Sequence, residues 1–394
     1  MKIDLIILAG GPGKRISLFT KKTPKPLIKF NNKIFLETLI RHFAKYDFNN
    51  IYILAGYKGK KIFEKFNNKT FNFTKVKCLI EKKRKGTWGA VLKNKKYIKN
   101  NFFLINADSL IDENFHNFFF QKNNSLINMT LVQNRSYKSN SKLNSLSLNR
   151  GKVVYSKNSK YMNGGVYFIN KKLLQKNNYK NARSIETEVI PDLIDQKKVS
   201  GFKSDNFFLD IGTYKNLNFG KKRLHSKLKK RAIFLDRDGV INYDKGYTYQ
   251  WNNFKFKKNV QKGLKFLINN NFLIFIVTNQ AGIGKGYYTE KNFQDLHKKI
   301  KSYLAIKGIY INDVKYCPYH PEAKFKKYRK KSLYRKPGNL MIKSILREWD
   351  IDIKKSIMIG DKDSDKRAAK KSNLFFEFAK EDFYQQVKKF IKGN

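Results

Sequence analysis

Two carboxylates that stand two residues apart are the strongest chemical signal in the second half of the sequence. The apolar residues from Ala232 to Leu235 suit a buried strand, and Asp236 and Asp238 follow just before a break at Gly239. Side chains at positions i and i+2 of an extended chain point to the same side, so both acids can face one site. One acid could attack a phosphorus atom while the other holds or supplies a proton. The alternative is an ordinary surface turn, because Asp-Gly pairs are common in turns.

Segments further along the chain favour the chemical interpretation over the turn. A second apolar run ends in Thr278 and Asn279, and the Thr278 hydroxyl can bind a phosphate oxygen. Arg335 and Lys336 supply cations that could neutralise a phosphate. A third apolar run ends in the acid Asp361, and carboxylate oxygens of this kind suit Mg2+.

This order of segments resembles the haloacid dehalogenase superfamily of phosphatases. The resemblance implies that Asp236 is a nucleophile that forms an aspartyl-phosphate and that Asp238 is the general acid and base. It implies that Thr278 and Lys336 bind phosphate, and that Asp236, Asp238 and Asp361 belong to a Mg2+ site. Asp365 would be a supporting acid.

Finer features narrow this resemblance to one branch of the superfamily. Gly246-Tyr247 and the run from Thr278 to Tyr287 look like the branch that holds heptose bisphosphate phosphatases and histidinol-phosphatases. Within this branch, Gly246-Tyr247 and the Gly-Tyr-Tyr-Thr-Glu run at 286–290 are more similar to the heptose member. Substrate contacts are therefore expected at Gly246, Tyr247, Thr278, Asn279, Arg335 and Lys336.

The zinc loop that is frequent in this branch is incomplete here. Cys317-Pro318-Tyr319-His320 keeps one cysteine, but Ser332 and Tyr334 stand where the pattern has its later cysteines. A structural zinc needs four nitrogen or sulfur ligands. We therefore expect no zinc and a loop that is held by packing.

Glycines that follow the first apolar run are the main signal in the first half. Ile3 to Ala9 is typical of a buried strand, and Gly10, Gly11 and Gly13 come directly after it. Such glycines let backbone N–H groups approach phosphates closely. The signal is weak by itself, because neither a Walker A motif nor a dinucleotide-binding fingerprint is present.

The segments that follow make the signal specific. Thr23-Pro24-Lys25-Pro26-Leu27, then Gly86-Thr87-Trp88-Gly89-Ala90, and then an apolar run ending at Asp108 resemble the sugar-1-phosphate nucleotidyltransferase family. Lys14 stands where the family has threonine. Trp88 stands where a small residue is usual, and we expect it to stack on the base or to crowd it.

This second resemblance implies a set of site residues. Asp108 and Asp210 would hold Mg2+, Asn163 and Gly164 would form a sugar-contacting turn, and Glu186 would contact sugar hydroxyls. Phosphate and nucleotide contacts are expected at Gly10, Gly11, Gly13, Gly86 and Thr87.

The implied reaction suits these residue types. A sugar 1-phosphate attacks the α-phosphorus of a nucleoside triphosphate, and pyrophosphate leaves. Such catalysis depends on positioning and charge neutralisation more than on a covalent intermediate. Lys25 and Arg15 would offset the phosphate charge.

Composition sets limits on the remaining function classes. The chain has 394 residues, enough for two domains of about 100–200 residues each, and carries a formal net charge of +54. The charge raises the alternative of a nucleic-acid-binding protein, but the lysines are spread along the chain and no nucleic-acid-binding signature is present.

Two cysteines, Cys78 and Cys317, give no disulfide framework, which fits a cytoplasmic protein. The first apolar run contains Asp4 and ends in glycines, so we expect it to be a strand and not a signal peptide. No run approaches the roughly 18 apolar residues of a membrane span.

The expected fold class is α/β in two domains. Residues 1–222 would form a Rossmann-like nucleotidyltransferase domain with a mixed sheet, residues 223–230 a basic linker, and residues 231–394 a haloacid dehalogenase-type domain with a parallel sheet and a minimal cap.

The two resemblances together predict a bifunctional enzyme of nucleotide-activated heptose synthesis. The second half would remove the 7-phosphate of a heptose 1,7-bisphosphate, and the first would transfer a nucleotidyl group, with GTP as the expected donor, to the heptose 1-phosphate. One alternative is a histidinol-phosphatase fused to a hexose-1-phosphate nucleotidyltransferase. A regulatory pseudoenzyme is a further alternative, and the complete set of acids argues against it.

Overall fold

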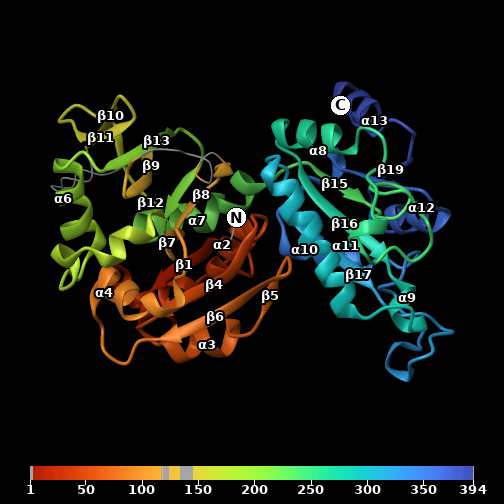
Figure 1. Cartoon of the computed structure of the whole chain (residues 1–394), viewed down its shortest axis with the longest axis horizontal. Coiled ribbons are helices and arrows are strands. Elements are labelled where there is room, and N and C mark those ends of the chain that lie inside the picture. Colours follow the sequence, from red (N-terminus) through yellow and green to blue (C-terminus); the bar gives the residue numbers. More distant parts are fainter. Residues whose placement is uncertain (1–2, 117, 119–123, 134–144, 394) are drawn as a thin grey trace. The chain divides into compact units, whose positions relative to one another are not determined.

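The chain folds into two compact units. The computed structural model describes residues 3–116, 118, 124–133 and 145–393 (Figure 1). The second unit takes the chain from Leu228 onward together with the short segments Arg41–Asp47 and Phe71–Phe73, and the first unit takes the rest.

A mixed ten-stranded sheet forms the centre of the first unit, in the order β10-β11-β13-β9-β12-β7-β1-β4-β6-β5. The strands are β1 (Ile3–Ala9), β4 (Phe48–Ala55), β5 (Thr70–Phe71), β6 (Thr74–Ile80), β7 (Phe102–Asn106), β9 (Ile127–Gln133), β10 (Leu146–Asn149), β11 (Lys152–Tyr155), β12 (Tyr161–Ile169) and β13 (Val199–Ser204). Strand β1 runs parallel to both β4 and β7, whereas β12 runs antiparallel to β7 and β9. Nearly every residue of β1 is buried, which explains its almost continuous apolar sequence.

Short helices and two small sheets complete this unit. The α-helices are α1 (Ser17–Thr20), α2 (Phe35–Ala44), α3 (Gly59–Phe66), α4 (Gly86–Lys93), α6 (Ile190–Asp195) and α7 (Tyr214–Leu228). A two-stranded antiparallel sheet joins β8 (Ser109–Ile111) to β14 (Phe208–Asp210), and a second joins β2 (Lys29–Phe30) to β3 (Lys33–Ile34). The β8–β14 pair matters for the site, because it brings the segment after β7 beside a segment that lies about a hundred residues later in the chain.

A five-stranded, entirely parallel sheet forms the centre of the second unit, in the order β17-β16-β15-β18-β19. Its strands are β15 (Ala232–Leu235), β16 (Leu273–Asn279), β17 (Asp313–Cys317), β18 (Ile357–Gly360) and β19 (Phe375–Phe378). Its α-helices are α8 (Val260–Asn269), α9 (Ala281–Lys285), α10 (Glu290–Ile306), α11 (Leu340–Glu348), α12 (Asp363–Lys370) and α13 (Phe383–Lys392).

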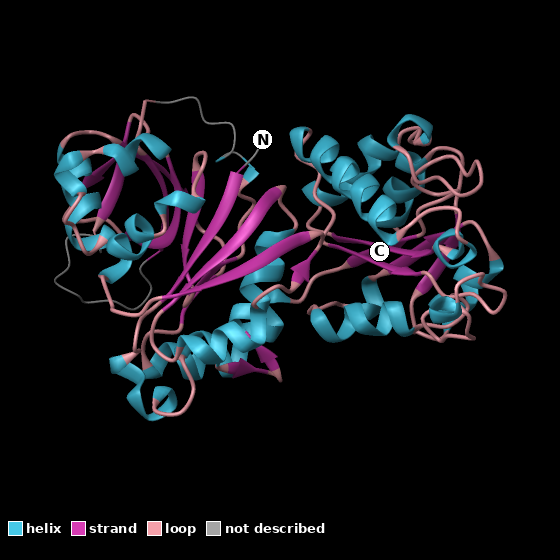
Figure 2. Ribbon diagram, turned by 60° about the horizontal axis from the view of Figure 1, so that its bottom comes forward, coloured by secondary structure: helices cyan, strands magenta, loops and turns pink. Residues whose placement is uncertain are grey.

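Helices cover both faces of this parallel sheet (Figure 2). On one face, Ile233 and Leu235 of β15 pack in a core with α8, α10 and α13. On the other face, Ala232 and Phe234 pack in a separate core with α11 and α12. The alternation of side chains along a strand explains why four consecutive apolar residues are needed here.

These two sheets confirm the expected fold class, a mixed-sheet α/β unit followed by a parallel-sheet α/β unit. The stretch 223–230, expected to be a linker, is occupied largely by the end of α7, and β15 begins at Ala232. In the described part of the chain, no helix is both long and apolar enough to cross a membrane.

Candidate active sites

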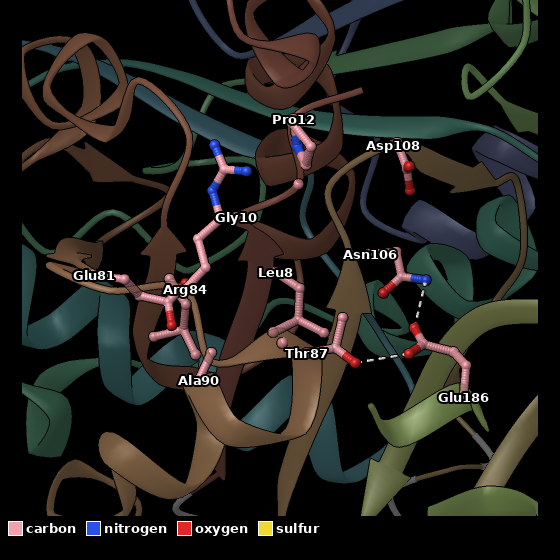
Figure 3. Close-up of a pocket in the computed structure, with 13 residues that line it drawn as sticks. Leu8, Gly10, Pro12, Glu81, Arg84, Thr87, Ala90, Asn106, Asp108 and Glu186 are labelled. Atoms are coloured by element: carbon pink, nitrogen blue, oxygen red, sulfur yellow. Dashed lines mark hydrogen bonds between the residues drawn. The ribbon is translucent and has the colours of Figure 1, made fainter. Parts of the chain in front are cut away.

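A cavity of about 300 Å³ opens at the carboxyl end of β1 in the first unit (Figure 3). Gly10, Gly11 and Pro12 form one part of its wall directly after the strand. Gly86 and Thr87, at the start of α4, form another part. Of these five residues, the sequence predicted all but Pro12 as nucleotide or phosphate contacts, and the fold brings them to one cavity.

Asp108 and Lys25 form an ion pair at the edge of this cavity. Asp108 follows β7 and lines the cavity, and its backbone carbonyl accepts a hydrogen bond from the Ile211 amide at 2.9 Å. The β8–β14 pairing places Asp210 opposite Ser109, so the two predicted metal-binding acids come from adjacent strands. The Gly212 amide donates to Asp210 Oδ1 at 2.6 Å.

The two acids have opposite electrostatic environments. Burial alone would raise the pKa of Asp108, but the Lys25 ammonium holds it below its ordinary value. Burial and the negative charge of Asp108 raise the pKa of Asp210 to about 6, although Lys25 and Arg15 act against this rise. A divalent cation between the two carboxylates would remove their mutual repulsion, so this acid pair fits a Mg2+ site.

Glu186 lies at another side of the cavity and is held by three side chains. It belongs to a short π-helix, Ile185–Val189, and Thr87 Oγ1 donates to its Oε2 at 2.7 Å. Asn106 Nδ2 donates to Oε1 at 3.4 Å, and Ser184 Oγ donates to Oε2 at 3.4 Å (Figure 3). Glu186 therefore has a fixed orientation at the cavity wall, as a sugar-contacting residue requires.

The other predicted residues of this unit are not among the lining residues of the cavity in the described part of the chain. Gly13 has a left-handed conformation with φ of 65° just before Lys14, which a residue with a side chain adopts only with strain. Asn163 Nδ2 donates to the Tyr167 hydroxyl at 2.7 Å, and Gly164 packs closely against the Thr130 carbonyl. Arg15 approaches Gly212, next to Asp210.

One expectation about this cavity is wrong. Trp88 neither stacks in the cavity nor crowds it, because its side chain is fully buried in the core of the unit. Its indole Nε1 donates to the Tyr179 carbonyl at 3.2 Å. On α4 the indole faces the core while the preceding residue, Thr87, faces the cavity, as helix geometry requires of adjacent positions.

Three lining residues with polar side chains carried no predicted role. Asn106 stands two positions before Asp108 at the same strand end, a spacing that puts both on one side. Glu81 follows β6 directly, and Arg84 lies three residues later. Their positions at the end of a predicted strand are the signal that could have identified them.

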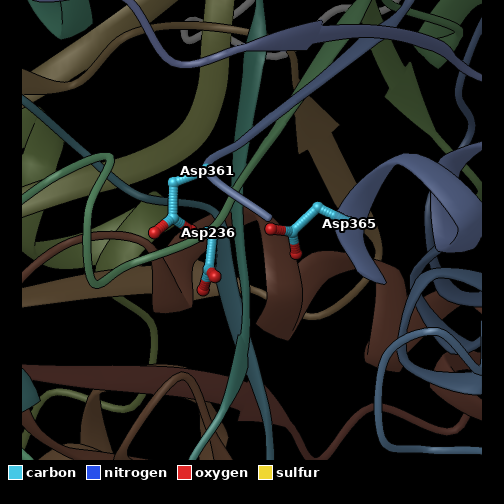
Figure 4. Close-up of side chains that lie close together, drawn as sticks. All are labelled: Asp236, Asp361 and Asp365. Carbon is cyan, nitrogen blue, oxygen red and sulfur yellow. The ribbon is translucent and has the colours of Figure 1, made fainter. Parts of the chain in front are cut away.

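Asp236, Thr278 and Asp361 stand at the carboxyl ends of three adjacent parallel strands in the second unit, β15, β16 and β18. Asp236, Asp361 and Asp365 can each offer an oxygen within 4.8 Å of the others (Figure 4). Asp361 Oδ1 is buried and has no hydrogen-bond partner among the described residues. An oxygen-rich group with an unsatisfied buried oxygen fits a hard cation such as Mg2+.

Lys336 connects two of these acids. Its Nζ lies 2.8 Å from Asp236 Oδ2 and 2.6 Å from Asp365 Oδ1, and all three side chains are almost fully buried. Burial raises the pKa of Asp236 to about 6, because Lys336 only partly offsets the cost of burying the charge. Burial alone would lower the pKa of Lys336, but Asp236 and Asp365 together raise it above its ordinary value.

Asp238 is held in place by side chains on three sides. Arg237, fully buried, contacts both carboxylate oxygens, with Nη2 2.9 Å from Oδ1 and 2.8 Å from Oδ2. Asn242 Nδ2 donates to Oδ1 at 3.0 Å, and Gln280 Nε2 donates to Oδ2 at 3.1 Å. Gln280 Nε2 also lies 2.9 Å from Thr278 Oγ1, so one amide connects the predicted general acid and base to a predicted phosphate-binding hydroxyl.

Neither Arg237 nor Gln280 carried a predicted role. The signal for Arg237 was its place between two acids, where a buried cation offsets their charge. Gln280 stood inside the run that resembles the heptose branch.

The loop that carries Lys336 is fastened to β16. Asn279 Nδ2 donates to the Lys336 carbonyl at 3.1 Å, and the Lys336 amide donates back to Asn279 Oδ1 at 3.0 Å. This reciprocal pair gives Asn279 a positioning role in addition to its predicted substrate contact.

A glycine makes room for the acids at the end of β15. Gly239 has φ of 81°, and a Cβ atom at this position would overlap the Asp361 carboxylate. The same is true of Gly360, where a Cβ atom would overlap Asp365. The close approach of the three acids therefore depends on glycine, which has no side chain, at positions 239 and 360.

Gly246 and Tyr247 lie on the loop after β15. The Gly246 amide donates to Asp244 Oδ1 at 3.0 Å, and Asp244 Oδ2 lies 3.3 Å from Lys362 Nζ. Lys362 also approaches Asp361 Oδ2 at 3.7 Å. The Tyr247 ring, 43% exposed, lies 4.5 Å from the Tyr287 ring.

Arg335 precedes Lys336 and is partly buried. Its Nη1 atom is buried and has no hydrogen-bond partner among the described residues. A guanidinium in this state is available to an incoming anion.

The incomplete zinc loop is held by local contacts. The buried Cys317 Sγ lies 3.9 Å from the Tyr319 carbonyl, and His320 Nδ1 accepts from the Glu322 amide at 3.1 Å. Tyr328 of this loop packs with Ile283 and Ala323 in a small apolar cluster.

Comparisons with known proteins agree with this geometry. Residues 5–142 match the family model of nucleotidyl transferases, and residues 233–391 match the model described as polynucleotide kinase 3 phosphatase. D-glycero-alpha-D-manno-heptose-1,7-bisphosphate 7-phosphatase of Burkholderia mallei is 41% identical over 141 residues, which cover 36% of this chain and 75% of that protein. D-glycero-beta-D-manno-heptose-1,7-bisphosphate 7-phosphatase of Rhodopseudomonas palustris is 36% identical over 163 residues, which cover 40% of this chain and 91% of that protein.

Among solved structures, HddC from Yersinia pseudotuberculosis is 24% identical with a TM-score of 0.46. The match covers 56% of this chain and 99% of that protein.

The chain is therefore a two-domain enzyme that joins a nucleotidyltransferase domain to a haloacid dehalogenase-like phosphatase domain. Through the second of these domains it belongs to the family of the D-glycero-D-manno-heptose-1,7-bisphosphate 7-phosphatases.

Proposed function

We propose that this bifunctional enzyme acts at two successive steps on one heptose. The second domain removes the 7-phosphate of D-glycero-D-manno-heptose 1,7-bisphosphate. The first domain then transfers GMP from GTP to the resulting heptose 1-phosphate and releases pyrophosphate. The observation that carries the proposal is the pairing itself, since the product of the phosphatase family is a sugar 1-phosphate, the substrate class of the attached transferase family.

In the phosphatase domain, we assign the nucleophilic attack to Asp236. Its carboxylate oxygen attacks phosphorus, the bond to the sugar oxygen breaks, and Asp238 supplies the proton that this oxygen takes. Water then hydrolyses the aspartyl-phosphate, with Asp238 removing a proton from the water. The Lys336 ammonium, 2.8 Å from the nucleophile, and the Thr278 hydroxyl would contact the phosphate oxygens.

The remaining predicted residues support this step. Asp361 together with Asp236 and Asp238 would hold Mg2+, which neutralises charge on the transferring phosphoryl group. Asn279 fixes the loop of Lys336, Arg335 offers a further cation, and Gly246-Tyr247 would contact the sugar.

In the transferase domain, no covalent intermediate is needed. A phosphate oxygen of the heptose 1-phosphate attacks the α-phosphorus of the nucleotide as the bond to pyrophosphate breaks. Lys25 and Arg15 offset phosphate charge, and the glycine turn at 10–13 holds the triphosphate. Asp108 and Asp210 would hold Mg2+, which neutralises the developing charge.

Contacts to the two substrates are shared among the remaining residues of this domain. Glu186 would accept hydrogen bonds from sugar hydroxyls, while Gly86 and Thr87 would lie against the nucleotide. Asn163 and Gly164 would shape the sugar end of the site.

We also propose boundaries and a location. The transferase domain would span residues 1–222, the linker 223–230 and the phosphatase domain 231–394, and the enzyme would work in the cytoplasm. Neither a zinc ion nor a specific nucleic-acid partner is part of the proposal.

A product assay by mass spectrometry tests the proposal. The purified chain is incubated with Mg2+, each of four nucleoside triphosphates, and the α or the β anomer of heptose 1,7-bisphosphate. GDP-heptose together with released phosphate is the expected product pair, with the α anomer as the expected substrate. Chelation of Mg2+ should stop both products, and its return should restore them.

Other outcomes of this assay are equally informative. Phosphate without any nucleotide sugar would contradict the proposed transferase substrates and leave the phosphatase step standing. Failure to release phosphate from either anomer, with turnover of histidinol phosphate instead, would overturn the heptose assignment.

A further inference from the structure

A glutamine amide joins the loop of the proposed general acid to the strand that carries the proposed phosphate-binding threonine. Gln280, which is 2% exposed, follows β16 directly. Its Nε2 atom donates to Asp238 Oδ2 at 3.1 Å and to Thr278 Oγ1 at 2.9 Å. The side-chain amide has two N–H bonds, so both contacts can form at once. The proposed reaction steps leave this buried amide without a role.

The hydrogen bond from Gln280 differs from the others that Asp238 accepts. Arg237 donates to both carboxylate oxygens and Asn242 donates to Oδ1, but both residues lie on the same loop as Asp238, residues 236–250. Among the described residues, Gln280 is the only side chain from outside this loop that donates a hydrogen bond to the carboxylate. Gln280 therefore fixes the acid relative to β16, whereas Arg237 and Asn242 would move with the loop.

Gln280 is itself held at its backbone and at its carbonyl oxygen. Its backbone amide donates to the Cys317 carbonyl at 2.8 Å, which extends the pairing of β16 with β17. The Tyr288 hydroxyl donates to Gln280 Oε1 at 2.6 Å. A reversed side-chain amide would turn its carbonyl oxygen toward the Asp238 carboxylate, which would repel it. Tyr288 thus holds the amide in the orientation that lets its N–H2 group face both the acid and the threonine.

Tyr288 has little freedom to move. Its side chain is 6% exposed, and its ring stacks on the Tyr249 ring with centroids 4.9 Å apart and planes 12° apart. A Cβ atom on Gly282 of α9 would overlap the Tyr288 ring, so the helix can approach the ring only with glycine there. Burial raises the pKa of Tyr288 above its ordinary value, although Arg237 acts against this rise. The hydroxyl therefore keeps the proton that it donates to Gln280.

This series of contacts suits two tasks of a phosphatase. The Thr278 hydroxyl accepts from Gln280, so its own hydrogen is left for a phosphate oxygen. The Asp238 carboxylate is held by the same amide, so the acid and the phosphate-binding hydroxyl keep a fixed separation. Proton transfer to a leaving oxygen depends on such positioning.

We propose that Gln280 is a positioning residue of the phosphatase domain, which, held by Tyr288, orients Asp238 toward the leaving sugar oxygen and Thr278 toward the phosphate. The inference rests on the proposed function in one respect, that Asp238 protonates the leaving oxygen of a phosphate ester. It adds two residues, Gln280 and Tyr288, whose effect on that proton transfer can be measured.

Two substrates that differ in their need for a proton test the assignment. The sugar oxygen of heptose 1,7-bisphosphate must be protonated as it leaves, whereas p-nitrophenolate leaves from p-nitrophenyl phosphate as a stable anion. The measured quantity is kcat/KM with the full chain and Mg2+, because it covers the steps up to the departure of the leaving group. Loss of the Thr278 contact would lower kcat/KM for both substrates. The ratio between the two values therefore isolates the effect on Asp238.

Removal of the amide should change this ratio strongly. Gln280→Met should lower kcat/KM for the heptose bisphosphate about 10²-fold more than for p-nitrophenyl phosphate. Tyr288→Phe keeps the amide but frees its carbonyl oxygen, so it should change the ratio in the same direction by about 10-fold. Hydrolysis of p-nitrophenyl phosphate reports that each variant has folded. If Gln280→Met does not fold, Tyr288→Phe provides the test.

A second buried tyrosine provides a matched control. Tyr328 belongs to the same apolar cluster as Tyr288 and is 8% exposed, and its hydroxyl donates to Glu290 Oε1 at 2.5 Å. Tyr328→Phe removes a buried hydroxyl that does not contact Gln280, so the ratio should stay that of the unaltered chain. An unchanged ratio in either Gln280→Met or Tyr288→Phe, or an equal change in Tyr328→Phe, would overturn the inference.

The inference and the proposed function can fail separately. If the unaltered chain hydrolyses histidinol phosphate and not the heptose bisphosphate, the proposed sugar is wrong, and the same ratio measured with histidinol phosphate still tests Gln280. If the heptose bisphosphate is the substrate and the ratio does not respond to Gln280→Met, the proposed function stands and the role of Gln280 is wrong.

Discussion

Each domain pairs a lysine with an aspartate that follows a central strand, but the two pairs differ in their exposure to water. The Lys336 side chain is 1% exposed and lies between Asp236 at 8% and Asp365 at 0%. The Lys25 side chain is 11% exposed and contacts Asp108, which is 28% exposed at a cavity wall. One lysine neutralises two buried acids, whereas the other neutralises one acid that water can reach.

This difference matches the two kinds of chemistry. A carboxylate that must attack phosphorus works best when it is fixed and partly stripped of water, as Asp236 is. A site that only brings two substrates together needs space and balanced charge, as the cavity near Asp108 provides. In the proposed mechanism, the same residue types would therefore serve covalent catalysis in one domain and positioning in the other.

The largest expected effect comes from removing Asp236, the proposed nucleophile. Asp236→Asn keeps the size of the side chain but cannot form the aspartyl-phosphate, so phosphate release should fall by about 10³-fold or more. Nucleotidyl transfer to purified heptose 1-phosphate should remain unchanged. Malachite-green detection of phosphate and mass spectrometry of the nucleotide sugar measure the two activities in one preparation. Loss of both activities in this variant would contradict the proposal that the two active sites work independently.

Asp108→Asn should give the reverse result with a somewhat smaller effect. Nucleotidyl transfer should fall by about 10²-fold or more, because a neutral amide holds a divalent cation poorly, and phosphate release should not change. The same two assays apply. Asp295→Asn on α10, where the side chain is 44% exposed, serves as the control and should alter neither activity. A phosphatase defect in Asp108→Asn would contradict the separation of the sites.

Substitutions of Lys336 and Lys25 test whether the difference in burial between the two ion pairs affects stability. Lys336→Met leaves two buried carboxylates without their cation, which should lower the free energy of unfolding by about 3 kcal/mol. Lys25→Met should lower it by at most about 1 kcal/mol, because water reaches Asp108 and screens its charge. Thermal and urea unfolding, followed by circular dichroism, compare the two variants. Equal losses of stability in Lys336→Met and Lys25→Met would show that the difference in exposure between the two ion pairs does not affect the free energy of unfolding.

The smallest expected effect concerns the loss of stability of the phosphatase domain at acidic pH. His297 on α10 is buried, and burial together with the Arg237 charge holds its pKa well below the ordinary value. The folded state thus keeps His297 neutral, so stability is complete above about pH 6.5 and declines as the pH falls below it.

His297→Leu should remove this component of the decline. Between pH 7.5 and 5.5, the unaltered chain should lose about 1 kcal/mol more stability than the variant, at about 1.4 kcal/mol for each pH unit below 6.5. Melting temperatures at the two pH values measure the difference. Parallel pH dependence of the two proteins would contradict a buried neutral histidine.

Much of the framework could be predicted from sequence because it depends on local pattern. The strands expected from Ile3 to Ala9 and from Ala232 to Leu235 have those bounds in the structure. Continuous apolar runs ending in glycine or aspartate specify buried parallel strands without reference to distant residues. The resemblance of ordered motifs then supplied the fold class.

The details of the sites depend on contacts between distant residues, which local pattern does not carry. The local pattern does not show that Lys336 lies between Asp236 and Asp365. It places Arg237 between two acids but does not show that this side chain contacts both oxygens of Asp238. Trp88 was misjudged because its neighbours in the motif face the cavity, whereas the packing of α4 turns its own side chain inward. The packing of the core, and not the motif, determines the direction in which such a side chain points.

The glycine at 239 has a consequence for any attempt to evolve this enzyme in the laboratory. A single methyl group there would push against the Asp361 carboxylate, and the chain would also have to hold φ at 81°. Random libraries that vary the loop after β15 to change the sugar specificity should therefore leave position 239 untouched. Diversity placed at Tyr247, a proposed sugar contact that is 43% exposed, would instead leave the three acids in place.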